Sequence, residues 1–161
     1  MSYPEPYAGY PPPGGAMTAP PASRATARLL SALCGLVLTP VGLGLGAAGG
    51  YRQAQVMAQY SPRVDVLALT LVLAGALVLL GVAALGAWSG TGPLVGGFVW
   101  GIVPGAVGMV SARTAIDLLD LLPRGTLNTG VLTWMFSGAL LAIGFLLAGT
   151  GLAVRLARRR R

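Results

Sequence analysis

The sequence has no lysine and no histidine, a single cysteine, and only four acidic residues among 161. Without histidine, neither a histidine-based catalytic triad nor a histidine-ligated zinc site can form. Cys34 has no second cysteine with which to make an internal disulfide, and as a small apolar residue it needs no further role. Charged residues make up 9% of the chain. Because soluble domains carry about 25%, this chain lacks the surface that would keep it in water.

Long uncharged runs take the place of a polar surface, in a composition that is 55% apolar. The runs cover residues 29–51, 66–112 and 125–154. About 20 apolar residues in a helix cross a hydrocarbon core of roughly 30 Å. We therefore expect an all-α, four-helix transmembrane bundle with spans at about 29–50, 66–88, 94–112 and 130–154. The stretch SGTGP at 89–93 ends the second span and turns the chain.

The positions of the arginines predict an orientation. Seven of the eleven lie in the two terminal segments: Arg24, Arg28, Arg155, Arg158, Arg159, Arg160 and Arg161. An even number of spans puts both ends on one side, so the positive-inside rule predicts a multi-pass protein of the inner (plasma) membrane with both termini cytoplasmic. The arginines at 155 and 158–161 should also contact anionic lipid headgroups, each contributing about 1 kcal/mol. Because they are occupied at the membrane, we expect no nucleic-acid partner.

The N-terminal tail, residues 1–27, is rich in Pro and Gly and carries Tyr3, Tyr7 and Tyr10. This composition predicts disorder with polyproline II character. Two interpretations stay open: a solvated leader, or a docking peptide for an aromatic groove on a cytoplasmic partner. At the other end, residues 156–161 form a short basic tail.

One pattern occurs twice along the chain. The segment RQAQVMAQYSPR at 52–63 is echoed by RTAIDLLDLLPR at 113–124, and a proline precedes each, at Pro40 and Pro104. After them, residues 69–86 and 132–149 match at seven of eighteen positions with a constant offset of 63. The order predicts two tandem helical hairpins, a parallel-type internal repeat whose pseudo-twofold axis runs along the membrane normal.

The two twelve-residue segments are then the outer connectors of the hairpins. Steps of four, three and four residues place the charges of the second connector on one helical face, where opposite neighbours contribute about 0.2–0.5 kcal/mol per pair. We expect the third helix to continue past the bilayer, or to bend into the interface, until Pro123 stops it. The charged connector residues are Arg52 and Arg63 in the first copy, and Arg113, Asp117, Asp120 and Arg124 in the second.

Glycine rows mark the odd-numbered spans. The rows are Gly42, Gly46 and Gly50 in the first span, and Gly97, Gly101 and Gly105 in the third. Glycine at every fourth position lets two helix backbones approach closely in lipid, so we expect spans one and three to cross near the pseudo-axis. Pro40 and Pro104 should kink these two helices and free one backbone carbonyl in each.

Residues for chemistry are scarce, and we expect no catalytic residue, metal site or cofactor. The pair Asp117 and Asp120 is flanked by Leu and bracketed by arginines, which favours a salt-bridged helix face over a magnesium site. Asp65 stands before an apolar run, where a carboxylate caps free backbone N–H groups. We expect a non-enzymatic accessory or scaffold protein, either a homo-oligomer or a subunit of a larger membrane complex. The alternative is a small dimeric pore or carrier for a neutral or weakly charged solute, built on the two proline kinks.

The Tyr/Pro/Gly leader, the all-arginine basic set and the spans rich in Ala, Gly, Leu and Val form a recognisable composition. It resembles that of small multi-pass membrane proteins of actinobacteria with GC-rich genomes, which are mostly of unassigned role. The resemblance implies membrane residence. It carries no motif, so no functional residue follows from it.

Overall fold

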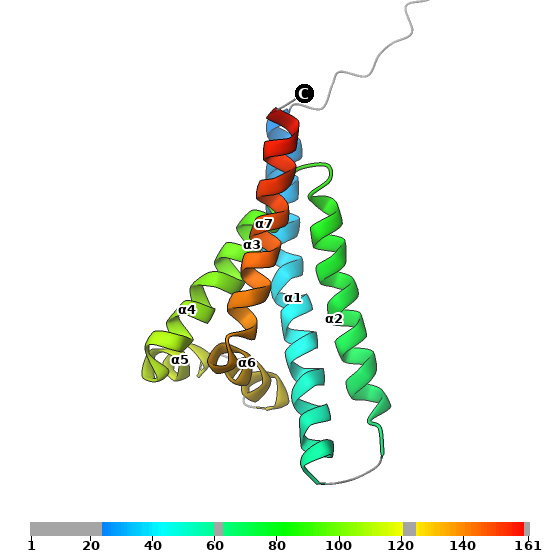
Figure 1. Cartoon of the computed structure of the whole chain (residues 1–161), viewed down its shortest axis with the longest axis vertical. Helices are drawn as coiled ribbons and strands as arrows, with labels where there is room; N and C mark the ends of the chain where they lie inside the picture. Colours follow the sequence, from blue (N-terminus) through cyan, green and yellow to red (C-terminus); the bar gives the residue numbers. More distant parts are fainter. Residues whose placement is uncertain (1–23, 60–62, 121–124, 160–161) are drawn as a thin grey trace, which may run out of the picture.

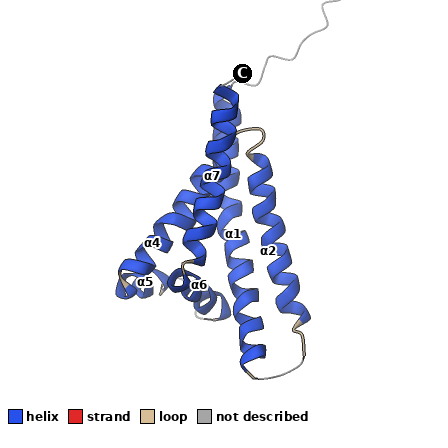
Figure 2. Ribbon diagram, viewed as in Figure 1, coloured by secondary structure: helices blue, strands red, loops and turns tan. Residues whose placement is uncertain are grey.

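The computed structural model describes residues 24–59, 63–120 and 125–159. Within these ranges all regular structure is helical, and short segments join the helices (Figure 2). The expected disordered tail lies outside the described residues up to position 23, as do positions 160–161. In chain order the helices are α1 (Arg24–Ala58), α2 (Val66–Leu85), α3 (Thr91–Gly97), the π-helix η1 (Phe98–Ile102), α4 (Val103–Val110), α5 (Ala112–Leu119), α6 (Thr126–Ser137) and α7 (Ala139–Arg159).

Four stretches are long and apolar enough to cross a membrane: Thr26–Ala58, Val66–Leu85, Thr91–Val110 and Ala139–Arg158. The expectation of an all-helical protein with four apolar, membrane-length helices is thus confirmed. Helix α1 begins and α7 ends at one end of the molecule, where the turn between α2 and α3 also lies (Figure 1). We call this the terminal end. The end of α1, the start of α2, and helices α5 and α6 lie toward the opposite end, which we call the connector end.

Helix α1 is longer than the expected first span of 29–50, because it continues through most of the first connector to Ala58. Residues 52–58, RQAQVMA, are good helix formers and contain neither glycine nor proline. Pro40 lies inside the helix without ending it. The first connector is therefore largely a helical extension rather than a loop.

The third span consists of three segments that follow one another without a break. Gly90 precedes Thr91, so α3 begins inside the stretch expected to be a turn, and Pro93 occupies its first helical turn, where no N–H donor is needed. The π-helix η1 then widens the helix just before Pro104. Proline cannot donate a hydrogen bond to the preceding turn, and such local widening commonly accommodates the defect. Helix α4 ends at Val110, where Ser111 adopts an extended conformation with φ −144° and ψ 103°.

The fourth span differs most from the expected range of 130–154. Gly138 has a φ of 76°, in the left-handed region, and divides this range into α6 and α7. Glycine adopts this conformation without a Cβ penalty and commonly ends a helix. Helix α6 consequently runs across the bundle at the connector end, and α7 alone has the length and apolar character of the fourth span (Figure 1).

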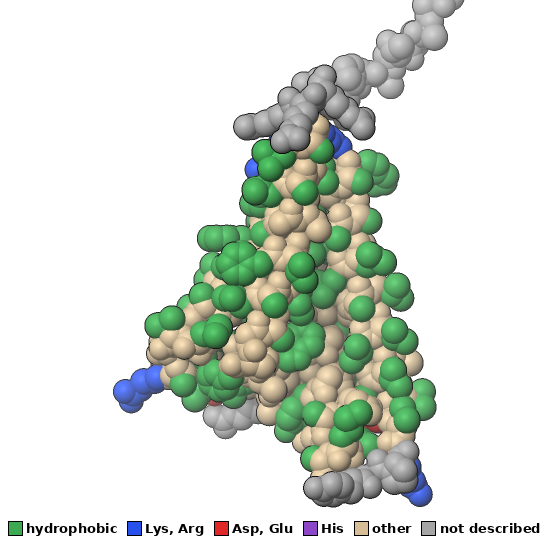
Figure 3. Space-filling view, viewed as in Figure 1, with side chains coloured by type: hydrophobic (Ala, Val, Ile, Leu, Met, Phe, Trp, Pro, Cys, Tyr) green, Lys and Arg blue, Asp and Glu red, His purple; other side chains and the backbone are tan. Residues whose placement is uncertain are grey.

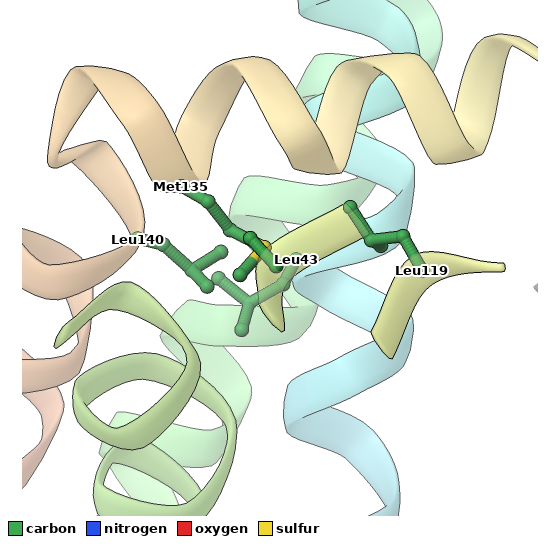
Figure 4. Packing of buried hydrophobic residues seen from close by; sticks show 5 residues of the cluster. Leu43, Leu119, Met135 and Leu140 are labelled. Atoms are coloured by element: carbon green, nitrogen blue, oxygen red, sulfur yellow. The ribbon is translucent and has the colours of Figure 1, made fainter. Parts of the chain in front are cut away.

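A small core forms where α6 crosses the other helices. Its buried side chains are Leu43, Ala115, Leu119, Met135 and Leu140 (Figure 4). They come from α1, α5, α6 and α7, so this cluster joins the broken second half of the chain to the first helix. Away from this core, many hydrophobic side chains are exposed along the helices, as Figure 3 shows for one face of the molecule. Such a surface is expected where helices face lipid.

Candidate functional site

The first glycine row packs against α2 and α6. A Cβ placed on Gly42 would lie 2.8 Å from the Leu79 Cγ of α2, and one placed on Gly46 would lie 2.9 Å from the Trp134 ring of α6. A Cβ placed on Gly50 would lie 3.7 Å from the Trp134 Nε1. The row therefore makes room for the second span and for an indole ring.

The second glycine row packs against α7. A Cβ on Gly97 would lie 2.7 Å from the Gly144 carbonyl oxygen, and one on Gly105 would lie 2.8 Å from the Leu141 nitrogen. A Cβ on Gly101 would overlap the Gly144 backbone. Both rows lie at close helix contacts, as expected, and spans one and three do pack together, but the expectation that the rows form that particular contact was wrong. Each row serves another helix, since side-chain direction and not spacing alone decides which neighbour a helix face meets.

Helices α1 and α3 do pack closely, but through other glycines. A Cβ on Gly35, Gly92 or Gly96 would overlap the backbone of the facing helix. Gly92 and Gly96 are themselves spaced at i,i+4, so the sequence held the signal. We missed this signal because we interpreted the segment 89–93, SGTGP, as a turn, whereas α3 begins within it.

The matched segments 69–86 and 132–149 use different faces. In α7, Leu140 and Leu147 are 2% and 6% exposed, and Gly144 between them contacts η1 and α3. At the offset of 63, the corresponding positions in α2 are Leu77, Gly81 and Ala84. We call these three residues the outer face of α2.

The outer face of α2 is exposed. Leu77 is 66% exposed, Gly81 and Ala84 are also exposed, and no heavy atom lies within 4 Å of a Cβ placed on Gly81. Helix α2 instead contacts α1 through a seam of residues seven apart, Ala68, Gly75 and Val82. The face that holds a neighbouring helix in the second half is therefore bare in the first.

Pro40 frees a carbonyl that a distant side chain then occupies. Because proline has no N–H, the Leu36 carbonyl has no donor four residues along α1. The Trp100 Nε1 of η1 donates a hydrogen bond to that oxygen at 2.9 Å. The π-helix that surrounds Trp100 thus places an indole N–H against the defect in α1, and the expected free carbonyl is accounted for at Pro40.

Asp65 organises the first connector. Its Oδ1 accepts hydrogen bonds from Leu67 N at 3.0 Å and Ala68 N at 3.2 Å, which confirms the expected capping role. Its Oδ2 accepts two from Arg52, from Nε at 3.1 Å and Nη2 at 3.0 Å. The Ala68 backbone N–H does most to lower the pKa of the Asp65 carboxyl; desolvation opposes it, and the Arg52 guanidinium and the Leu67 N–H lower the pKa further. The ion pair ties the end of α1 to the start of α2.

The second connector bends, as one of the two expected alternatives, to form α5. Ser111 Oγ accepts a hydrogen bond from Thr114 N at 3.3 Å and starts this helix. Asn128 of α6 donates to the Leu119 carbonyl at 2.8 Å near its end. Both Arg113 and Asp117 are exposed, and no ion pair joins these two described residues. Pro123, which we expected to stop this helix, and Arg124, which we expected on its charged face, lie outside the described residues.

At the terminal end, the turn between α2 and α3 is wedged between α1 and α7. Ser31 of α1 donates to the Ser89 carbonyl at 2.9 Å and accepts from Gly92 N at 3.1 Å. On the other side, the turn lies against α7. A Cβ on Gly90 would overlap the Gly151 carbonyl, so the absence of a side chain on these two glycines allows the close contact. Both helices therefore contact the turn directly.

Three arginines surround this turn. Arg155 Nη2 donates to Thr91 Oγ1 at 3.2 Å, and Arg158 Nη2 donates to the Ala87 carbonyl. Arg28 of α1 faces them across a cavity of about 780 Å³, whose polar lining includes Ser89 and Thr91. Arg155 and Arg158, which we expected to contact lipid headgroups, therefore line the same cavity as Arg28. The side chains at 159–161 lie outside the described residues.

Comparison of the chain with protein-family models, with curated proteins and with solved structures found no match. Among the described residues, no group of three or more His, Cys, Asp or Glu lies close enough to hold a metal ion. The features on which a function can be argued are therefore the bare face of α2 and the arginine-lined cavity of the terminal end.

Proposed function

We propose that this chain is a non-enzymatic membrane protein that works by binding other transmembrane helices, as an accessory or scaffold. The observation that carries the proposal is the outer face of α2. Leu77, Gly81 and Ala84 are exposed, and nothing lies within 4 Å of a Cβ at Gly81. In lipid, helices associate largely through van der Waals packing at small residues. An exposed helix face with a glycine is therefore suited to pack against another helix.

The matched positions of α7 support this proposal. Gly144 receives the helix of the third span so closely that its own Cβ would lie 2.6 Å from Ile102 N. If the chain is a duplicated hairpin, as we propose from the repeated sequence, Gly81 is the counterpart of Gly144. A helix from outside the chain would then fill the position that the third span fills for α7.

The first partner we expect is a second copy of this chain. One face on one helix is enough for a self-complementary dimer, because a twofold axis brings the same patch of both subunits together. The arginine-rich ends would lie on the cytoplasmic side of the plasma membrane, following the positive-inside rule, so both copies would enter the bilayer in the same orientation.

Counting copies in lipid tests the proposal. The full chain, labelled with one dye per copy, is reconstituted into liposomes at low density, and photobleaching steps are counted for each spot. Gly81→Leu should convert dimers into monomers, because its side chain fills the contact. Ala76→Leu places the same leucine side chain at another exposed position of the same helix and should leave the dimer intact.

Other outcomes separate the alternatives. A wild-type monomer that co-purifies in mild detergent with a different membrane protein, and loses it on Gly81→Leu, keeps the helix-binding function and replaces the second copy by that protein. A chain that stays monomeric and retains no partner contradicts the proposal. Solute flux through liposomes that Gly81→Leu leaves unchanged would favour the small pore or carrier instead.

A further inference from the structure

The cavity at the terminal end is a second candidate site, independent of the helix-binding face. Its volume of about 780 Å³ lies within the range of about 300–1,000 Å³ typical of small-molecule pockets. Arg28 borders it from α1, and Arg155 and Arg158 border it from α7. The turn between α2 and α3 supplies Ser89, and Thr91 is the first residue of α3; their hydroxyl oxygens are hydrogen-bonded at 3.1 Å.

The charge of this cavity is not balanced within the described part of the chain. The described carboxylates belong to the start of α2 (Asp65) and to α5 and its C-cap (Asp117 and Asp120), and these elements lie toward the connector end (Figure 1). The hydrogen bonds of Arg155 and Arg158 go to neutral oxygens, at Thr91 and Ala87. Guanidinium groups that converge without a carboxylate favour an anion, and their fork of N–H groups fits phosphate oxygens best.

The geometry also fixes the groups that would meet the anion. Ser31 pins the turn to α1 through its bonds to Ser89 and Gly92, while the Arg155 Nη2 bond pins Thr91 to α7. Trp88 borders the same cavity and is 80% exposed, as is typical of indoles at a membrane interface. A rigid hydroxyl pair beside three cationic side chains distinguishes this cavity from a loose basic tail.

We propose that the cavity bounded by Arg28, Arg155, Arg158 and Thr91 binds a phosphate group. Two sources have this chemistry: the headgroup of an anionic phospholipid and a soluble phosphate ester. In either case the guanidinium groups bind the oxygens of the phosphate. The Thr91 hydroxyl accepts from Arg155 and shares a hydrogen bond with the Ser89 hydroxyl; with Ser89 as the donor of that bond, the Thr91 proton is available to a phosphate oxygen.

Native mass spectrometry tests the lipid source. The full chain is released from vesicles of phosphatidylcholine and phosphatidylglycerol, and the retained phosphatidylglycerol is counted. Arg155→Gln and Thr91→Val should each lower retention about tenfold, since a hydrogen bond to a charged group is lost. Thr91→Ser keeps the hydroxyl and should restore it. Arg113→Gln removes the same charge at the connector end and is the matched control, with no expected loss.

Glycerol phosphate tests the soluble source. It is titrated into the chain in phosphatidylcholine nanodiscs, with binding heat as the measurement, for the wild type, Arg155→Lys and Arg113→Gln. Binding that Arg155→Lys weakens and Arg113→Gln does not, without retained phosphatidylglycerol, assigns the site to a soluble phosphate. Equal losses for Arg113→Gln and Arg155→Gln would reveal general attraction of charge and overturn the proposal, as would binding of neither ligand.

Discussion

The first half of the molecule, α1 and α2, consists of two unbroken helices, whereas the second half, α3 to α7, divides a similar length into six segments. The matched sequences make this contrast informative, because GAL-x3-G-x4-G occurs in both halves at an offset of 63. Gly75 continues the helix in the first copy, and Gly138 ends one in the second. The same local sequence therefore permits both outcomes, and its surroundings choose between them.

The surroundings of these two glycines explain the choice. A Cβ on Gly75 would lie 2.6 Å from the Gly42 carbonyl oxygen, so the straight α2 lies against the backbone of α1. A Cβ on Gly138 would meet only the Met109 sulfur, at 3.8 Å, so no backbone of another helix lies against this position as α1 lies against Gly75. The break at Gly138 lets α6 fold across α1 and place Trp134 against Gly46. The broken half thus covers the connector end of the unbroken half.

The largest expected effect contrasts the two counterparts Gly144 and Gly81. Gly144→Val should lower the free energy of unfolding by about 3 kcal/mol, because its side chain overlaps the third span. For the monomer, Gly81→Val should change it by less than about 0.5 kcal/mol, since that position has no neighbour within the chain. Steric trapping in bicelles measures both. Gly149→Val, in the same helix as Gly144 and without neighbours, is the control for added bulk.

A smaller effect separates the two glycines of the GAL motif. Gly75→Ala should destabilise the fold by about 2 kcal/mol through its clash with the α1 backbone, whereas Gly138→Ala should do so by about 1 kcal/mol through its positive φ alone. Gly138→Asn tolerates the left-handed region better and should recover part of the loss. The same unfolding measurement applies. A larger loss for Gly138→Ala than for Gly75→Ala would reverse the explanation given for the contrast.

The next smaller loss of stability is expected at the contact between the two halves near Pro40. Trp100→Phe removes the hydrogen bond to the Leu36 carbonyl and should lower stability by about 1 kcal/mol. Pro40→Ala restores an N–H to α1, so the Leu36 carbonyl no longer needs the indole. A double-mutant cycle of the two changes should therefore show coupling. Additive effects would mean that Trp100 stabilises the contact through its ring alone.

The smallest effect concerns pH and the connector of the first half. The pKa of Asp65 is lowered in the folded state, so its contribution to stability is present above the ordinary carboxyl pKa of about 3.9 and is lost as the pH falls through the folded value. Thermal unfolding in detergent should show this loss in acid for the wild type. Asp65→Asn should remove that part of the pH dependence. An unchanged acid profile in Asp65→Asn would assign it to other carboxylates.

Much of the architecture could be predicted from the sequence, because charge-free apolar runs of this length predict helices that are long and apolar enough to cross a membrane. Capping by Asp65 was equally predictable, since an acid before an apolar run has few other roles. The break at Gly138 was not, because Gly75 is followed by the same Ala-Leu and continues its helix. The Trp100 contact with Leu36 spans 64 residues, and no local pattern contains it.

The site was predicted less completely. The arginines at 155 and 158 were identified by their charge, but Arg28 and the turn at Ser89 and Thr91 meet them only after α1, α3 and α7 pack together. The glycine rows were found, yet their partners depended on how each helix is rotated about its axis. Spacing defines a face, and the fold decides what that face meets.

Cysteine cross-linking in native membranes tests the helix-binding account most directly. In a Cys34→Ala background, single cysteines Leu77→Cys, Gly81→Cys and Ala84→Cys report on the outer face of α2, and Ala76→Cys reports beside it. Oxidation should link the first three to a second copy, or to one partner protein, and should leave Ala76→Cys unlinked. No cross-links at any position, or equal cross-linking at all four, would contradict the account.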